Sequence, residues 1–328
     1  MSKVSYIAFL FAALIGLSVG QCEAQKLANA TSEPVVLDTG TGTLYGTLLV
    51  PASKKAGPVV LIIAGSGPTD RDGNSAILSG PNNSLKMLAD GLAQAGIASL
   101  RYDKRGIGES RKTLGNQADL RFDLYVRDAE MWVKKMRSDK RFTTVTVAGH
   151  SEGSLIGMVA AKNAGADGYI SIAGVGKPAN LILHDQFKPQ LPEAVMKRAD
   201  EVLDSLAAGK TVESYPPELV SIFHPTIQPY VISWFKYDPT KEIAKLKIPA
   251  LIVQGTSDAQ VTVGDANLLS QSYKAAKLVL IEGMNHVLKY VDKDADLQKR
   301  SYTDPSIPIE PKLVAESANF IKKSVRRR

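Results

Sequence analysis

Cysteine and histidine are scarce in this chain, and their scarcity excludes several kinds of site. The 328 residues contain one cysteine, Cys22, and four histidines. A single thiol cannot form a disulfide within the chain, and four scattered histidines do not have the spacing of a zinc site. We therefore expect neither an intramolecular disulfide nor a metal centre.

A phosphate-binding glycine motif and a strongly charged body are also lacking. The glycine-rich segment 65–73 has neither the G-x-x-x-x-G-K-[ST] nor the G-x-G-x-x-G spacing, which argues against a nucleotide site. The net charge is +7, but five of the positive charges lie in the C-terminal segment 322–328. We expect a nearly neutral body with a solvated basic tail, and no nucleic-acid partner.

The N-terminus has the features of a secretory signal peptide. Lys3 precedes an apolar run over about residues 4–20, and a small-x-small sequence ends at Ala24. We expect cleavage of residues 1–24 near Ala24, which would remove Cys22 and leave a periplasmic or secreted protein without stable membrane insertion. An uncleaved membrane anchor is the alternative, although the run is shorter than the roughly 20 residues that a membrane span prefers.

Short apolar runs alternate with helical periodicity through most of the chain. The runs predict strands at 43–50, 59–64, 97–101, 144–148, 169–172, 250–254 and 277–281. The periodic stretches predict helices at 84–95, 120–137, 152–162, 264–273 and 311–323. Strands that alternate with helices indicate an α/β fold with a mostly parallel sheet covered on both faces.

One long interval interrupts this alternation. Residues 177–247 separate two consecutive predicted strands, where a crossover normally needs only a dozen or more residues. The interval is rich in aromatic residues and has helical stretches at 192–208 and 217–235. We expect a helical cap inserted between two parts of the core, 25–176 and 248–328, and such an insertion can act as a lid. Alternatively, its aromatic residues form only the insertion's own small core.

The sequence Gly-His-Ser-Glu-Gly at 149–153 directly follows a predicted strand and is typical of a nucleophile elbow. In that turn the flanking glycines remove side chains that would collide with the neighbouring strand and helix. A serine hydroxyl is a weak acid, so attack on a carbonyl requires a histidine base that is held by a carboxylate. We therefore predict that Ser151 is a nucleophile.

His286 and Asp258 are the predicted partners of Ser151. Of the other histidines, one is adjacent to the serine and two lie in the insertion, whereas His286 follows a late strand. In sheets of this kind the order is Ser, then Asp or Glu, then His, each at the carboxyl end of a strand. Asp258 follows the strand at 250–254 and meets that requirement. Asp265 is the nearest competitor, but its place at the start of a helix favours a helix-dipole role.

Acyl transfer also needs N–H donors for the oxyanion that forms on the substrate. The backbone amide of Glu152 is one candidate, because it lies at the start of a helix, where amides are unpaired. The second donor is expected in the loop 65–73. Ser66 is favoured there, and Gly67 is the alternative.

Charged residues within and after this loop have two possible roles. Asp70, Arg71 and Asp72 lie in the loop, and Asp103 follows a later predicted strand. We interpret them as a structural ion-pair cluster that braces the loop, with substrate contact as the alternative.

With these elements in this order, the chain resembles the α/β-hydrolase superfamily over about residues 40–325. Segment 101–110, RYDKRGIGES, is similar to the D-x-R-G-x-G-x-S segment of serine aminopeptidase-like esterases and peptidases. With the loop 64–74, it resembles cap-bearing bacterial carboxylesterases. Ala64 departs from the histidine that many members carry there as a loop brace. The resemblance implies an eight-stranded, mostly parallel sheet, a cap after the sixth strand, no cofactor and hydrolysis through an acyl-enzyme.

The leading functional hypothesis is a serine hydrolase that cleaves small-molecule carboxylic esters with an apolar portion. An exopeptidase with the same triad is the nearest alternative and would need a carboxylate for a free substrate amine. Candidates for that carboxylate in the insertion include Glu193, Glu201 and Glu213. A non-catalytic binding protein of the same fold is the alternative from another class, and an intact Ser-Asp-His set argues against it.

Overall fold

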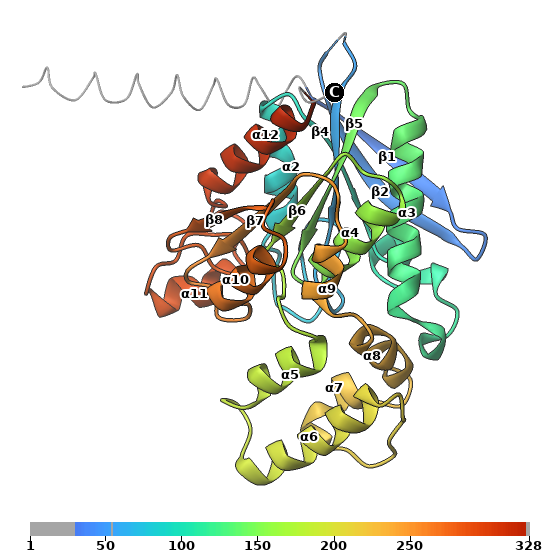
Figure 1. Ribbon diagram of the computed structural model, residues 1–328, viewed down its shortest axis with the longest axis vertical. Coiled ribbons are helices and arrows are strands. Elements are labelled where there is room, and N and C mark those ends of the chain that lie inside the picture. The colour runs from blue at the N-terminus through green and yellow to red at the C-terminus, as the bar shows by residue number, and fades with distance from the viewer. Residues whose placement is uncertain (1–29, 54, 326–328) are drawn as a thin grey trace, which may run out of the picture.

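The computed structural model describes residues 30–53 and 55–325 (Figure 1). The signal peptide predicted at 1–24, with Cys22, lies outside these described residues. Within them, no helix is both long and apolar enough to cross a membrane.

A single eight-stranded sheet forms the centre of the molecule, as Figure 1 shows. The strands are β1 (Ala30–Asp38), β2 (Thr43–Pro51), β3 (Gly57–Ile63), β4 (Ala98–Tyr102), β5 (Phe142–His150), β6 (Gly168–Ile172), β7 (Ala250–Gly255) and β8 (Lys277–Ile281). Their order is β1-β2-β4-β3-β5-β6-β7-β8. The pairs β1/β2 and β2/β4 are antiparallel and all the others are parallel, which confirms the predicted mostly parallel sheet.

All seven predicted strands are present, and the eighth, β1, was not identified from the apolar pattern. β1 is an edge strand whose residues are mostly exposed or half-buried, and Pro34 lies within it. An edge strand tolerates proline and needs no continuous apolar face, so its sequence carries little strand signal.

Helices cover both faces of the sheet (Figure 1). They are α2 (Ser84–Gln94) and α12 (Pro311–Val325) on one face, and α3 (Phe122–Ser138), α4 (Glu152–Asn163) and α10 (Val263–Ser272) on the other. In β3, Leu61 and Ile63 pack with α3 and α4, whereas Val60 and Ile62 pack with α2 and α12. Successive residues of a strand point to opposite faces, so a continuous apolar strand supplies two cores.

The segment between β6 and β7 is helical. It contains α5 (Ala179–Phe187), α6 (Glu193–Ala207), a 3-10 turn η3 (Pro217–Leu219), α7 (Val220–Phe223), α8 (Gln228–Phe235) and α9 (Pro239–Ala244). The helical stretch predicted at 217–235 is helical at both ends, but it is divided into η3, α7 and α8 with a break between residues 223 and 228. Pro225 lies at the break after α7, and proline in a helix interior removes a hydrogen bond and clashes with the preceding turn.

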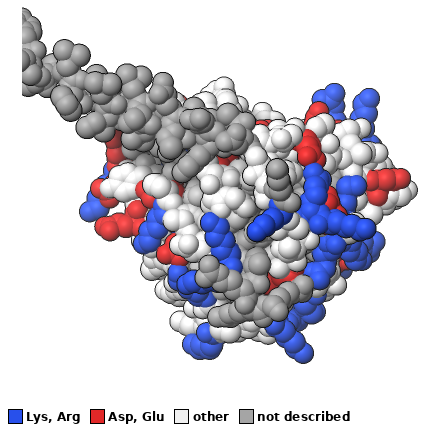
Figure 2. Space-filling view, turned by 90° about the horizontal axis from the view of Figure 1, so that it is seen from above, with Lys and Arg blue, Asp and Glu red and all other residues white. Residues whose placement is uncertain are grey.

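The inserted helices have a hydrophobic cluster of their own, centred on Phe223 and Leu203. Tyr230 on α8 packs against this cluster and also against the cluster on the sheet face that α3, α4 and α10 cover. Figure 2 views the molecule from the opposite end and shows Lys and Arg side chains, with fewer Asp and Glu, among other residues. The inserted helices lie at the carboxyl end of the parallel strands, because β6 continues directly into α5 (Figure 1).

Candidate active site

Ser151 lies on a sharp turn between β5 and α4. Its backbone has φ 55° and ψ −122°, an uncommon combination for a residue with a side chain. A Cβ on Gly149 would collide with the Gly153 carbonyl, and one on Gly153 would lie 2.5 Å from the carbonyl oxygen of Ile63. Both glycines are therefore needed for the close approach of strand and helix, as in a nucleophile elbow.

Asp258 and His286 lie on the loops that follow β7 and β8, and their side chains are hydrogen-bonded. The distance from His286 Nδ1 to Asp258 Oδ2 is 2.8 Å, and both residues are buried. The other carboxylate oxygen accepts backbone N–H groups from Gln260 at 2.8 Å and Val261 at 2.9 Å. These bonds fix the carboxylate and leave it facing the imidazole.

Electrostatics keeps Asp258 ionised. Burial opposes ionisation, but His286 and the two backbone donors outweigh burial and hold the pKa of the carboxyl below its usual value. An ionised carboxylate only accepts hydrogen bonds, so it favours the His286 tautomer with a proton on Nδ1 and a free lone pair on Nε2. The imidazole is then able to act as a base at Nε2.

His150 connects the serine turn to the His286 loop. Its Nε2 lies 2.8 Å from the backbone oxygen of His286, and the two ring centroids are 4.8 Å apart. Burial, with the neighbouring His286, lowers the pKa of His150 to about 3, so this ring is neutral and structural. The residue before Ser151 thus holds the serine turn against the His286 loop at the carboxyl edge of the sheet. Among the described residues, the Ser151 hydroxyl makes no hydrogen bond to His286. Catalytic hydrogen bonds are often long in the free enzyme and tighten only in the substrate complex.

The loop after β3 lies beside the serine. A Cβ placed on Gly65 would be 3.2 Å from the Cβ of Ser151 and 3.3 Å from His150 Nδ1. Within the described residues, the amides of Ser66 and Gly67 make no hydrogen bond. The amide of Glu152 is the first of α4 and has no partner in its own helix. Free N–H groups are therefore available on both sides of Ser151.

Sequence reasoning missed a buried ion pair next to these amides. Lys104 Nζ lies 2.9 Å from Glu152 Oε2 and 2.5 Å from the backbone oxygen of Gly65. The ammonium also lies over the Tyr125 ring, 4.9 Å from its centroid. The Tyr230 hydroxyl donates to the other oxygen of the Glu152 carboxylate. Lys104 is part of the segment 101–110, but nothing in its spacing distinguishes it from a surface lysine.

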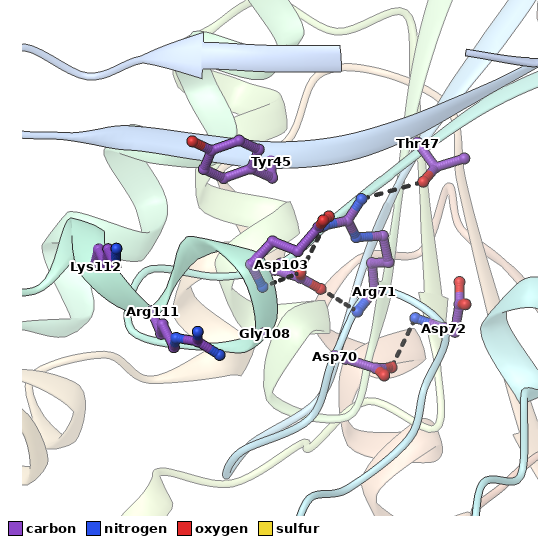
Figure 3. Close-up of a pocket in the computed structure, with 10 residues that line it drawn as sticks. Tyr45, Thr47, Asp70, Arg71, Asp72, Asp103, Gly108, Arg111 and Lys112 are labelled. Carbon is purple, nitrogen blue, oxygen red and sulfur yellow. Dashed lines mark hydrogen bonds and ion pairs between the residues drawn. The ribbon is translucent and has the colours of Figure 1, made fainter. Parts of the chain in front are cut away.

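Ion pairs brace the rest of the loop, as predicted for Arg71, Asp72 and Asp103, whereas the Asp70 carboxylate accepts hydrogen bonds from Asp72 and Asn74 within the loop. Arg71 bonds Asp103 at 2.7 Å (Figure 3). Arg71 also contacts Glu109, and Arg101 contacts Asp72. A cavity of about 740 Å³ lies among these charged side chains. Its lining does not include Ser151, Asp258 or His286, and Arg71, Asp103 and Glu109 in that lining are paired with one another.

The competing candidates have other partners. Asp265 forms a capping box with Thr262 at the start of α10 and accepts the Gly176 N–H at 3.0 Å. His184 pairs with Asp200, both in the inserted helices, at 2.7 Å. Among residues 30–53 and 55–325, no group of three or more His, Cys, Asp or Glu side chains could hold a metal ion.

The chain is similar to known proteins in sequence and in fold. Residues 82–294 match the family model described as serine aminopeptidase, S33. Esterase EstD from Thermotoga maritima is 29% identical over 256 residues, which are 76% of this chain and 59% of that protein. The match thus spans less than two thirds of the relative's length.

Solved structures share the fold at low sequence identity. Est1E from Butyrivibrio proteoclasticus has a TM-score of 0.58 and 18% identity, over 89% of this chain and 99% of that one. The hydrolase GrgF from Penicillium sp. sh18 has a TM-score of 0.60 and 18% identity, over 90% and 99% of the two chains. At this level of identity the likeness concerns the fold.

Proposed function

Because this chain belongs to the serine aminopeptidase S33 family of α/β hydrolases, we propose that it is a serine hydrolase that cleaves carboxylic esters. We also propose that it acts in the periplasm or outside the cell, on the basis of the N-terminal sequence. The observation that carries the proposed chemistry is the buried Asp258–His286 pair, whose loop is bonded to His150 next to a serine with φ 55°. Resemblance to an esterase, EstD, supports an ester as the substrate.

In the proposed reaction, Ser151 Oγ attacks the ester carbonyl while His286 Nε2 removes the hydroxyl proton. Asp258 holds the imidazole in the required tautomer and stabilises the imidazolium. The amides of Glu152 and Ser66 donate to the oxyanion of the tetrahedral intermediate. Its collapse breaks the bond to the leaving alkoxide, which takes the proton from His286. Water then hydrolyses the acyl-enzyme by the same sequence of proton transfers.

Labelling with a fluorophosphonate probe tests this proposal. The wild-type protein should be labelled on Ser151, and Ser151→Ala should be neither labelled nor able to hydrolyse p-nitrophenyl acetate. Equal labelling of both proteins, or labelling of neither, would show that Ser151 is not an activated nucleophile.

An exopeptidase is the second candidate, because the matched family is named for aminopeptidases. A free substrate amine needs an unpaired carboxylate in the site. Glu193, Glu201 and Glu213 are exposed on the inserted segment, and Glu152, which is next to the serine, is paired with Lys104. Because the carboxylate next to the serine is already paired, these contacts favour an ester over a peptide as the substrate. Comparison of p-nitrophenyl esters with aminoacyl anilides distinguishes the two, and faster anilide turnover would reverse the choice.

We also propose that the helices at 177–247 form a cap over this site. The support is that α8 contacts α6 within the insertion and α3 in the core, while Tyr230 of α8 reaches Glu152. Aromatic side chains at this junction suit an apolar portion of the substrate.

A further inference from the structure

The ammonium of Lys104 connects both sides of the site proposed to hold the oxyanion. It donates to the backbone oxygen of Gly65 at 2.5 Å and to the Glu152 carboxylate at 2.9 Å. Gly65 is in the loop after β3, and Glu152 is the first residue of α4. The Lys104 side chain is only 1% exposed and that of Glu152 only 3%. One buried cation thus spans two segments that are about ninety residues apart in the sequence.

The contact with Gly65 acts on the peptide that contains the Ser66 amide. The Gly65 carbonyl and the Ser66 N–H belong to one planar peptide unit, so a bond that fixes the oxygen also fixes the direction of the N–H. A cation at the oxygen further polarises the peptide and strengthens the N–H as a donor. Ala64 has no polar group that could brace the loop in this way. The Lys104 contact therefore favours Ser66 over Gly67 as the second donor.

The contact with Glu152 extends the same network to the inserted helices. The Tyr230 hydroxyl, from α8, donates to the second oxygen of the Glu152 carboxylate. Burial and the nearby carboxylate raise the pKa of Tyr230 well above its ordinary value, so the phenol keeps its proton. In Figure 1, α8 lies on the side of the insertion that faces the core. Removal of this hydroxyl would leave one carboxylate oxygen without its donor from the insertion.

A buried ion pair is weak evidence for stability, because desolvation of two charges can exceed their attraction. A role in positioning accounts better for a pair that contacts both donor segments. We propose that Lys104, Glu152 and Tyr230 are positioning residues that hold the Ser66 and Glu152 amides toward the oxyanion. Because Tyr230 comes from α8, the orientation of the two amides then depends on the contact between the inserted helices and the core. The role of the amides rests on the proposed function.

The test uses the variant Lys104→Met/Glu152→Gln, which removes both charges and leaves no uncompensated ion in the core. Loss of a complete oxyanion donor lowers kcat by about 10²–10³-fold. A donor that is displaced but present should lower kcat by about 10- to 100-fold, with KM changed less than about threefold. Affinity for a trifluoromethyl ketone, which forms a tetrahedral adduct, should fall by the same factor as kcat/KM. Tyr230→Phe should show a smaller loss of the same kind.

Asp128→Asn is the matched control. Arg105 and Asp128 form a neighbouring buried ion pair at 2.7 Å that touches neither donor segment. This variant should lose stability but keep its affinity for the ketone. Equal losses of ketone affinity in the control and in the double variant, or a loss confined to KM, would overturn the positioning role. Retention of kcat within about threefold in the folded double variant would do the same.

A second readout does not depend on turnover. The amide signals of Ser66 and Glu152 in 15N-labelled protein should be sharp and single in the wild type. They should broaden or double in Lys104→Met/Glu152→Gln and stay unchanged in Asp128→Asn. If the wild type fails to react with the fluorophosphonate, the proposed function fails, while these signals still decide whether the network orders the two amides. Unchanged signals in the double variant would refute the positioning role.

Discussion

At the scale of single residues, side chains of the same type have different roles in the site because they have different hydrogen-bond partners. Asp258 and Asp265 are seven positions apart, both buried and both near the carboxyl edge of the sheet. Asp258 bonds His286, whereas Asp265 caps α10 and accepts the Gly176 N–H. The histidines divide in the same way, because only His286 of the four bonds a buried carboxylate.

Because the two aspartates have different partners, we expect the same Asp-to-Asn substitution to affect turnover at one position and stability at the other. Asp258→Asn should lower kcat by about four orders of magnitude, because an amide stabilises the wrong tautomer of His286. Asp265→Asn should lower the free energy of unfolding by about 1 kcal/mol through the weakened cap and change kcat/KM by less than about threefold. Hydrolysis of p-nitrophenyl acetate and urea unfolding measure the two effects. A comparable loss of turnover in both variants would contradict the assignment of Asp258.

At the scale of elements, the strand-to-helix turn after β5 is the most constrained part of the site. Ser151 has positive φ, and its amide donates to the Ile172 oxygen of β6 at 3.0 Å. Gly149 and Gly153 pack against backbone atoms, which cannot move aside as a flexible side chain can. The turn is thus held by the sheet on one side and by α4 on the other.

Gly149→Ala should therefore disrupt this turn. Overpacking of a close-packed region typically costs about 1–3 kcal/mol, and a collision with backbone should reach the upper end of that range. Gly115→Ala is the control, because Gly115 is exposed and a Cβ there meets nothing within 4 Å. Thermal unfolding and fluorophosphonate labelling should show losses for Gly149→Ala alone. A stable and fully reactive Gly149→Ala protein would disprove the packing argument.

At the scale of the whole molecule, the hydrophobic core is divided. Two clusters lie on the two faces of the sheet, and a third lies among the inserted helices. α6 packs on α5 and α8, while α8 also contacts α3 and so joins the insertion to the core. Segments with their own core and few contacts elsewhere can open without global unfolding. We therefore expect α5 to α8 to open separately from the sheet, whereas α9 packs on α4 and α10 and should stay with it.

Phe223→Ala tests this division. Phe223 is fully buried in the third cluster, and such a truncation costs about 3–5 kcal/mol. Hydrogen exchange should become faster in residues 179–235 and stay unchanged in the central strands. Leu61→Ala, in the sheet, is the comparison and should raise exchange throughout the chain. Faster exchange of the strands in Phe223→Ala would show instead that insertion and sheet unfold as one unit.

Much of the architecture could be predicted from local patterns, because apolar periodicity is a property of neighbouring residues. Seven strands, the five core helices and the helical segment between β6 and β7 follow from that periodicity and from the length of one interval. The pattern failed for β1, an exposed edge strand, and within 217–235, where prolines interrupt a run that is otherwise helical. In both places the local signal is weak or mixed, and the structure depends on neighbours that are distant in the sequence.

The sequence by itself determined the chemistry proposed here: Ser151 in its glycine-flanked turn, and Asp258 and His286 in the order that a parallel sheet brings to one edge. Spacing is enough for these residues because each follows a strand. Only the tertiary structure decided that Lys104, Glu152 and Tyr230 meet. They come from three segments with no common motif, and a buried lysine cannot be distinguished from an exposed one until the surrounding side chains exclude water.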